Sequence, residues 1–155
     1  MKRNFSEKEK GVALYIAVVI TGVLLLVSYA IINTAIKQLG ISNSTRDSQA
    51  AFYAADSGIE CALFWDLKGG LIYNGSAFST STTRNISCNN TNISVGGVAT
   101  STFDLDFLPE PYCATVVVGK SYNGNVLTTH IESRGYNSCD STDLRRVERA
   151  IEVNY

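Results

Sequence analysis

The feature that most constrains this chain is an apolar segment from Val12 to Ile36 that contains no charged residue. A helix rises about 1.5 Å per residue, so a helix of this length crosses a hydrocarbon core of about 30 Å. Lys2, Arg3, Lys8 and Lys10 precede the segment, and such basic residues are retained on the cytosolic side of a membrane. The sequence therefore predicts a single-pass membrane helix, with the N-terminus in the cytosol and the rest of the chain outside.

Two other interpretations of this segment compete. A secretory signal peptide has an apolar core of about 7–15 residues followed by a small-residue cleavage site. The segment is longer than that, and Ser28-Tyr29-Ala30 matches such a site poorly. An uncut signal anchor is the stronger alternative, and periodicity alone does not separate it from a segment that is processed.

Helical spacing continues beyond the apolar segment. Apolar residues recur along one stripe after Gln49, and no proline occurs before Pro109, so we expect one helix, or two nearly collinear helices, from about Val12 to Asp66. Gly40 and the polar residues 43–45 are positions where that helix could bend. Gly69-Gly70 is expected to end it. The stripe consists of Ala50, Tyr53, Ala54, Ile59, Cys61, Ala62 and Trp65.

The second half of the chain has the two-residue period of β-strands. Residues 74–102 are rich in Ser, Thr, Asn and Gly and predict a long loop with at most short strands, with a weak signal around Ile86. Three segments predict strands: Phe103–Phe107, Cys113–Val118 and Arg146–Tyr155. With the amphipathic half of the helix over its apolar face, this antiparallel sheet of three to five strands predicts an α+β fold.

Asn123-Gly124 predicts a two-residue hairpin turn, because both central positions of such a turn need positive φ. Folding about that turn sets Val116 opposite Ile131 and places Cys113 near Arg134. The last strand would direct Val147, Ile151, Val153 and Tyr155 to the core.

The cysteines number four, Cys61, Cys88, Cys113 and Cys139, and none forms a CxxC pair or lies within ligand spacing of the single histidine. The sequence thus predicts no metal site and no cofactor, but two disulfides and an oxidising compartment. Three connectivities are open. Cys61–Cys88 and Cys113–Cys139 are favoured, because Cys113 and Cys139 lie toward one end of the expected sheet.

No catalytic motif is found, so the chain is not expected to be an enzyme. Asp104 and Asp106 are interpreted as a solvated strand face and His130 as an exposed or partly packed side chain. Residues 140–143 are interpreted as a polar turn, although they could hold a calcium ion. The formal net charge of −1 does not favour nucleic acid. Arg145, Arg146 and Arg149 could contact a phosphate or a partner's carboxylates, but usually such a run is a solvated edge.

A basic leader, a small residue at the start of a charge-free helix, an amphipathic continuation and a disulfide-bearing sheet together resemble a type IV prepilin. Lys10-Gly11, followed by Val12-Ala13-Leu14, resembles the prepilin-peptidase cleavage motif. The stretch Phe52–Glu60 resembles that of PilX-like minor pilins and the related large minor pseudopilins. This resemblance implies a cut after Gly11 and an N-methylated Val12. The small residue has a physical reason, since a bulky side chain would hinder entry to a protease at the membrane face.

The chain departs from the pilin pattern at Ile16. Pilins of this group usually carry Glu at the fifth position after the cut, where it is thought to pair with a neighbour's N-terminal ammonium. An unpaired carboxylate in an apolar filament core costs several kcal/mol. The resemblance therefore implies a minor, tip-associated subunit that primes assembly.

The resemblance also implies an organisation and a set of partners. A leader (1–11) would be removed, residues 12–36 would form the filament-core helix, 37–68 its amphipathic continuation and 69–155 the head. The partners would be the prepilin peptidase, other pilin or pseudopilin subunits and an inner-membrane assembly platform, with nucleic acid conceivable only at a filament tip. The competing hypotheses are an uncleaved, membrane-anchored extracellular binding module and, with least support, a secreted enzyme.

Overall fold

The computed structural model describes residues 7–69, 72, 75–78 and 81–155, and gives only the backbone for residues 7–10. Lys2 and Arg3 of the expected leader, and Gly70 of the expected helix stop, lie outside the described residues. By their internal contacts the residues form two units, 1–43 and 44–155. The second half of the long helix thus belongs to the same unit as the sheet.

One helix, α1 (Glu7–Leu67), contributes to both units. It remains helical at Gly40 and at residues 43–45, where the sequence allowed a bend. It ends two residues before Gly69, and the Lys68 amide still donates to the Phe64 carbonyl at 2.8 Å. Of the two alternatives, one continuous helix is confirmed. No proline interrupts it, and a single glycine costs only about 1 kcal/mol in helix propensity.

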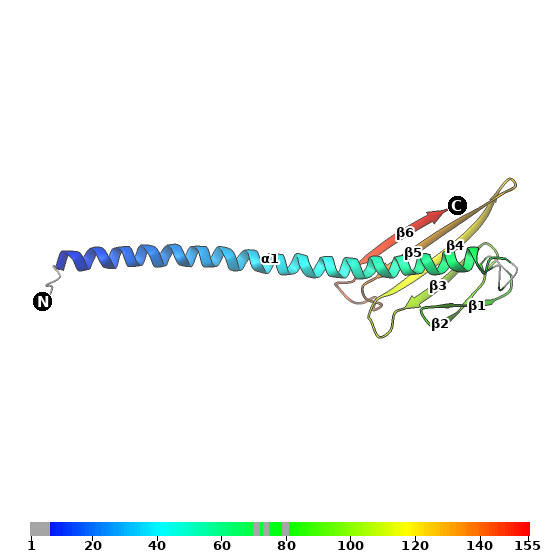
Figure 1. Cartoon of the computed structure of the whole chain (residues 1–155), viewed down its shortest axis with the longest axis horizontal. Coiled ribbons are helices and arrows are strands. Elements are labelled where there is room, and N and C mark those ends of the chain that lie inside the picture. The colour runs from blue at the N-terminus through cyan, green and yellow to red at the C-terminus, as the bar shows by residue number, and fades with distance from the viewer. Residues whose placement is uncertain (1–6, 70–71, 73–74, 79–80) are drawn as a thin grey trace. The chain divides into compact units, whose positions relative to one another are not determined.

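The head unit contains two antiparallel sheets (Figure 1). Strands β3, β4, β5 and β6 form a four-stranded sheet in that order, and β1 pairs with β2 in a separate hairpin. Figure 1 shows the second half of α1 lying along the larger sheet. Their bounds are Arg84–Cys88 (β1), Thr91–Val95 (β2), Thr100–Asp106 (β3), Cys113–Asn123 (β4), Val126–Tyr136 (β5) and Glu148–Asn154 (β6).

Small residues bring α1 directly onto the sheet. A Cβ added at Gly135 of β5 would lie 2.0 Å from the Ala51 carbonyl oxygen and 2.4 Å from the Ala55 amide nitrogen. On the helix side, a Cβ added at Gly58 would lie 2.7 Å from a methyl carbon of Val116. At Gly135 the helix and strand backbones therefore approach too closely for any larger side chain, and at Gly58 the side chains of β4 and β5 already fill the space.

The core lies between the inner face of the sheet, α1 and the smaller hairpin. Buried and exposed residues alternate along β3, with Phe103 and Leu105 buried and Asp104 and Asp106 exposed. The prediction of a solvated carboxylate face on this strand is confirmed. Elsewhere in the head the fully buried side chains include Phe78, Ile86, Val95, Val116, Val118 and Ile131.

The register predicted for the β4–β5 hairpin is wrong. The structure pairs Asn123 with Val126 and Val116 with Ser133, and Cys113 faces Tyr136 in place of Arg134. The turn is Gly124-Asn125, with φ of 64° at Gly124, so glycine occupies the first central position, as a type II′ turn requires. The change moves each partner by two residues, which preserves the faces because side chains alternate with a period of two.

Other boundaries differ by a few residues. Residues 74–102 do hold short strands, with Ile86 in β1, and β3 begins at Thr100, earlier than expected. Strand β6 is shorter than predicted. Of its expected core residues, Ile151 and Val153 pack against the core, whereas Tyr155 is 43% exposed.

Two disulfides, Cys61–Cys88 and Cys113–Cys139, are present in the head unit, with Cα–Cα distances of 6.0 and 5.6 Å. This is the pairing that the sequence favoured. The first joins α1 to the end of β1, and the second joins the start of β4 to the segment after β5. The long helix, the antiparallel sheets and the two disulfides together establish the α+β fold.

Candidate functional site

The expected cleavage junction, Lys10-Gly11-Val12, lies within α1. Gly11 and Val12 are exposed, and a Cβ added at Gly11 would meet no atom within 4 Å. The side chain of Lys10 lies outside the described residues. Neither packing nor backbone conformation within the chain therefore requires a glycine at position 11.

The apolar segment presents its side chains outward in every direction. Large apolar side chains from Val12 to Ile41 are between 46% and 72% exposed, and Ile16 is 50% exposed. Among the residues that the structure describes, α1 is the one helix long and apolar enough to cross a membrane. A helix that is apolar all round needs lipid or other helices as its surroundings.

Three hydroxyl groups within this segment donate hydrogen bonds to their own helix. Thr21 donates to the Ala17 carbonyl at 2.9 Å. Ser28 and Thr34 do the same to the Leu24 and Ala30 carbonyls, at 2.8 and 2.9 Å. Each hydroxyl donor is thus satisfied locally, as an environment without water demands.

The stretch Phe52–Glu60 has two faces. Ala54, Ala55 and Gly58 are buried against the sheet, while Phe52 and Tyr53 are 47% and 63% exposed. The small residues of this stretch therefore serve the packing of the head. The aromatic residues remain available for a neighbouring molecule.

The most buried charged group in the head is Asp66, near the end of α1, at 8% exposed. Its carboxylate lies 2.7 Å from the Lys120 ammonium of β4. It also accepts hydrogen bonds from the Tyr155 hydroxyl at 2.6 Å and from the Ser76 hydroxyl. The C-terminal residue is thereby fixed to the helix, and Tyr155 and Thr129 exchange two backbone hydrogen bonds at 2.7 and 3.1 Å.

This network shifts the pKa of its members. Burial alone would raise the pKa of Asp66, but hydrogen bonds from Lys120, Ser76 and Tyr155 outweigh it and hold the pKa below 3.8. Partial burial, together with the hydrogen bond to Asp66, raises the pKa of the Tyr155 phenol. The four side chains are bonded to one another, and none is left as a free nucleophile. The network therefore joins the end of α1 to the sheet and has a structural role.

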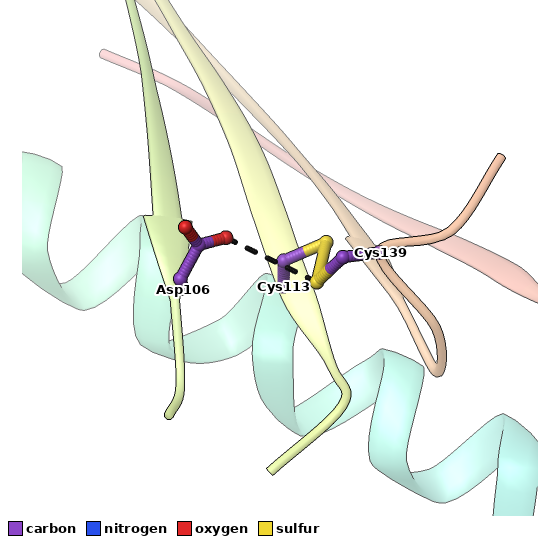
Figure 2. Close-up of side chains that lie close together, drawn as sticks. All are labelled: Asp106, Cys113 and Cys139. Carbon is purple, nitrogen blue, oxygen red and sulfur yellow. Dashed lines mark hydrogen bonds between the residues drawn. A yellow bond between two sulfur atoms is a disulfide. The ribbon is translucent and has the colours of Figure 1, made fainter. Parts of the chain in front are cut away.

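A second group gathers where β3 and β4 meet the Cys113–Cys139 disulfide (Figure 2). The Asp106 carboxylate points toward the bridge, 3.9 Å from Cys139 Sγ. Both sulfurs are bonded to each other, so neither is a thiolate that could bind a metal. Sulfur in a disulfide has no proton to donate, so the approach is only a contact.

The three arginines near the C-terminus are not equivalent. The Arg146 guanidinium lies 3.7 Å from the centre of the Tyr136 ring, and Arg149 donates to the Ser48 hydroxyl of α1 at 2.8 Å. Arg145 is exposed, and its carbonyl accepts a hydrogen bond from Asn137. Two of the three guanidinium groups therefore contact other residues of the head.

The turn at residues 140–143 is closed by its own hydrogen bonds. The Asp140 carboxylate accepts from the Thr142 amide at 2.8 Å and from the Thr142 hydroxyl at 2.7 Å. These bonds lower the pKa of Asp140. The geometry is that of a polar turn, as interpreted from the sequence.

Sequence reasoning missed the Asp66, Lys120 and Tyr155 junction. The three residues are up to 89 positions apart, and none belongs to a motif. One signal was available: Asp66 follows Trp65 on the apolar stripe, where a charge requires a buried partner.

The comparisons with known proteins bear on the N-terminal segment. No curated protein and no solved structure matches this chain. The family model described as PilX N-terminal matches residues 10–60, which include the expected cleavage junction, the apolar segment and the stretch Phe52–Glu60. Over these residues the chain is similar to PilX-like type IV minor pilins.

Proposed function

We propose that this chain is a minor, tip-associated subunit that primes assembly of a type IV pilus or of a related type II secretion filament. The PilX N-terminal match carries the proposal, because it supports a minor-pilin role. The exposed apolar helix supports it independently, since such a surface must be covered by lipid before assembly and by other subunits afterwards.

The first step would be removal of residues 1–11 by a prepilin peptidase and N-methylation of Val12. Gly11 supports this step, because it has no packing role within the chain. Its place in the stretch that resembles the prepilin-peptidase motif distinguishes it from Gly22, which also has no packing role. The remaining helix would stay in the inner membrane, with the head outside, until the assembly platform moves it into the filament.

The second step would place this subunit at the tip. Ile16 offers no carboxylate to the ammonium of a subunit above it, while the processed N-terminus can still pair with the glutamate of a subunit below it. A chain with only the lower contact can begin a filament but cannot extend one. Adhesion by the exposed head, or contact with a secreted substrate, would follow from that position.

The test compares two glycines of the same helix. Neither Gly11 nor Gly22 has an atom within 4 Å of an added Cβ, so Gly11→Val and Gly22→Val should both leave the structure intact. The full chain is produced with and without a prepilin peptidase, and its intact mass and N-terminal sequence are measured. We expect a methylated Val12 N-terminus in wild type and Gly22→Val only with the peptidase, and none in Gly11→Val.

Persistence of Met1 in wild type under both conditions would contradict the proposal and support the uncleaved membrane-anchored module. Equal processing of Gly11→Val would show that the glycine is incidental to cleavage. Both results are independent of head folding, which the fluorescence of Trp65, the one tryptophan of the chain, reports separately.

A further inference from the structure

Four polar side chains form a compact block on the outer face of strands β5 and β6. Ile131 and Ser133 face the core, so their neighbours His130 and Glu132 lie on the opposite face. The sheet register pairs Glu132 with Glu152 and His130 with Asn154. An imidazole, two carboxylates and an amide therefore occupy adjacent positions on two paired strands.

Three of these groups are close enough to share an ion. One ligand atom from each of His130, Glu132 and Glu152 lies within 4.8 Å of the other two. In a tetrahedral zinc site with bonds of about 2.0 Å, neighbouring ligand atoms are roughly 3.3 Å apart. The glutamate side chains have enough rotatable bonds to move by that difference at the surface without any change in the backbone.

The fourth residue orients the imidazole. His130 Nδ1 lies 2.7 Å from the Asn154 side-chain oxygen, which as an acceptor holds the proton on Nδ1. Nε2 is then left with its lone pair. A hydrogen bond from the non-coordinating ring nitrogen to an oxygen is the usual support of a metal-binding histidine.

The electrostatics of the block favour a cation. Two carboxylates directly opposite each other on paired strands repel. Glu132 is partly compensated by Arg134, whose Nε donates to one oxygen at 2.6 Å. The Glu152 carboxylate has no hydrogen bond or ion pair with any other residue that the structure describes.

Space is available beside the imidazole. On the neighbouring strand β4, Gly119 is the partner of His130. An added Cβ there would meet only the His130 carbonyl oxygen, at 3.8 Å, so no side chain from this position covers the ring.

We propose that His130, Glu132 and Glu152 bind one divalent transition-metal ion, with Zn²⁺ preferred, and that Asn154 is the positioning residue of His130. One imidazole nitrogen and two carboxylate oxygens suit Zn²⁺ better than Ca²⁺ or Mg²⁺, which take oxygen ligands. Three protein ligands leave a fourth position for water or an external ligand. The site does not depend on the proposed pilus function.

The experiment titrates Zn²⁺ into the full-length chain in detergent micelles by calorimetry, with Ca²⁺ as the comparison ion. We expect one Zn²⁺ per chain. The affinity should fall at least 100-fold in His130→Gln and about 10-fold to 100-fold in Glu152→Gln and Asn154→Ala. Asp104→Asn removes another carboxylate of the same sheet face and should leave the affinity unchanged.

A second readout observes the metal at its ligand. His130 is the single histidine, so one pair of imidazole nitrogen signals appears in the NMR spectrum, and Zn²⁺ should shift the Nε2 signal strongly. Wild-type affinity for Zn²⁺ in His130→Gln, an unmoved Nε2 signal in the presence of saturating Zn²⁺, or Ca²⁺ binding as tight as that of Zn²⁺ would each overturn the proposal. Trp65 fluorescence verifies that each variant is folded.

Discussion

At the scale of single residues, Asp66 determines how the end of α1 is fixed to the sheet. Its carboxylate joins Lys120 of β4, Ser76 and the C-terminal Tyr155. Removing one partner of a buried ion pair leaves the other charge without compensation. The cost of a substitution here therefore exceeds that of any exposed carboxylate in the head.

Asp66→Asn should lower the free energy of unfolding by about 3 kcal/mol at pH 7, because Lys120 loses its counter-charge. The folded pKa of Asp66 lies below 3.8, so its contribution is complete above the unfolded pKa and is lost as the pH falls through the folded pKa. The stability difference between wild type and Asp66→Asn should therefore shrink as the pH falls through the folded pKa of Asp66. Urea unfolding followed by Trp65 fluorescence measures this difference.

The control for Asp66 is Asp104→Asn, an exposed carboxylate of β3 that accepts a hydrogen bond from Thr115 at 2.7 Å. Its effect should stay within about 0.5 kcal/mol. The junction would lose its assigned role if the two variants cost the same, or if the cost of Asp66→Asn did not change with pH.

At the scale of elements, the contact of α1 with β5 depends on the lack of a side chain at Gly135. Gly135→Ala places a methyl group against the backbone of Ala51 and Ala55, and backbone atoms cannot move aside as a side chain can. We expect a loss of about 3 kcal/mol. Gly119→Ala, on the adjacent strand, meets a single atom at 3.8 Å and should cost less than about 1 kcal/mol. Equal unfolding midpoints in urea would contradict this account of the packing.

The elements also show what sequence alone could predict. The helix, the strands and their buried faces can be predicted from the spacing of apolar residues, because that spacing recurs over many positions. The hairpin register depends instead on two adjacent dipeptides, Asn123-Gly124 and Gly124-Asn125, each an acceptable turn. The cross-strand partners, with Val118 opposite Ile131, decide between them, and they cannot be identified before the register is known.

The candidate sites differ in the same way: a site formed by consecutive residues can be predicted from the sequence, whereas a site formed across strands cannot. The proposed cleavage junction is contiguous in sequence, so Gly11 could be singled out directly. The block of His130, Glu132 and Glu152 joins two strands, and its composition is visible only once they pair. Cysteine spacing, from which the sequence predicts no metal site, carries no information about such a block.

At the scale of the whole molecule, the chain combines an apolar helical segment with exposed side chains and a head stabilised by its own core and disulfides. Under the proposed function, Ile16 decides how such a molecule enters a filament. Ile16→Glu supplies the carboxylate that would pair with the N-terminal ammonium of the subunit above. This variant should therefore enter the filament shaft more often than wild type does. Immunogold labelling along purified filaments measures that distribution, with Ile16→Gln as the uncharged control. Unchanged labelling at the tip alone would count against the role given to Ile16.

Under the proposed function the head lies outside the cell, and there the Cys61–Cys88 bridge has a consequence for its resistance to proteases. The backbone between these two cysteines connects α1 to β1 and to the strands that follow. With the bridge closed, a second covalent route joins the helix to β1. A single nick anywhere between the two cysteines would therefore leave the head attached to its anchor, and only a nick combined with reduction would release it.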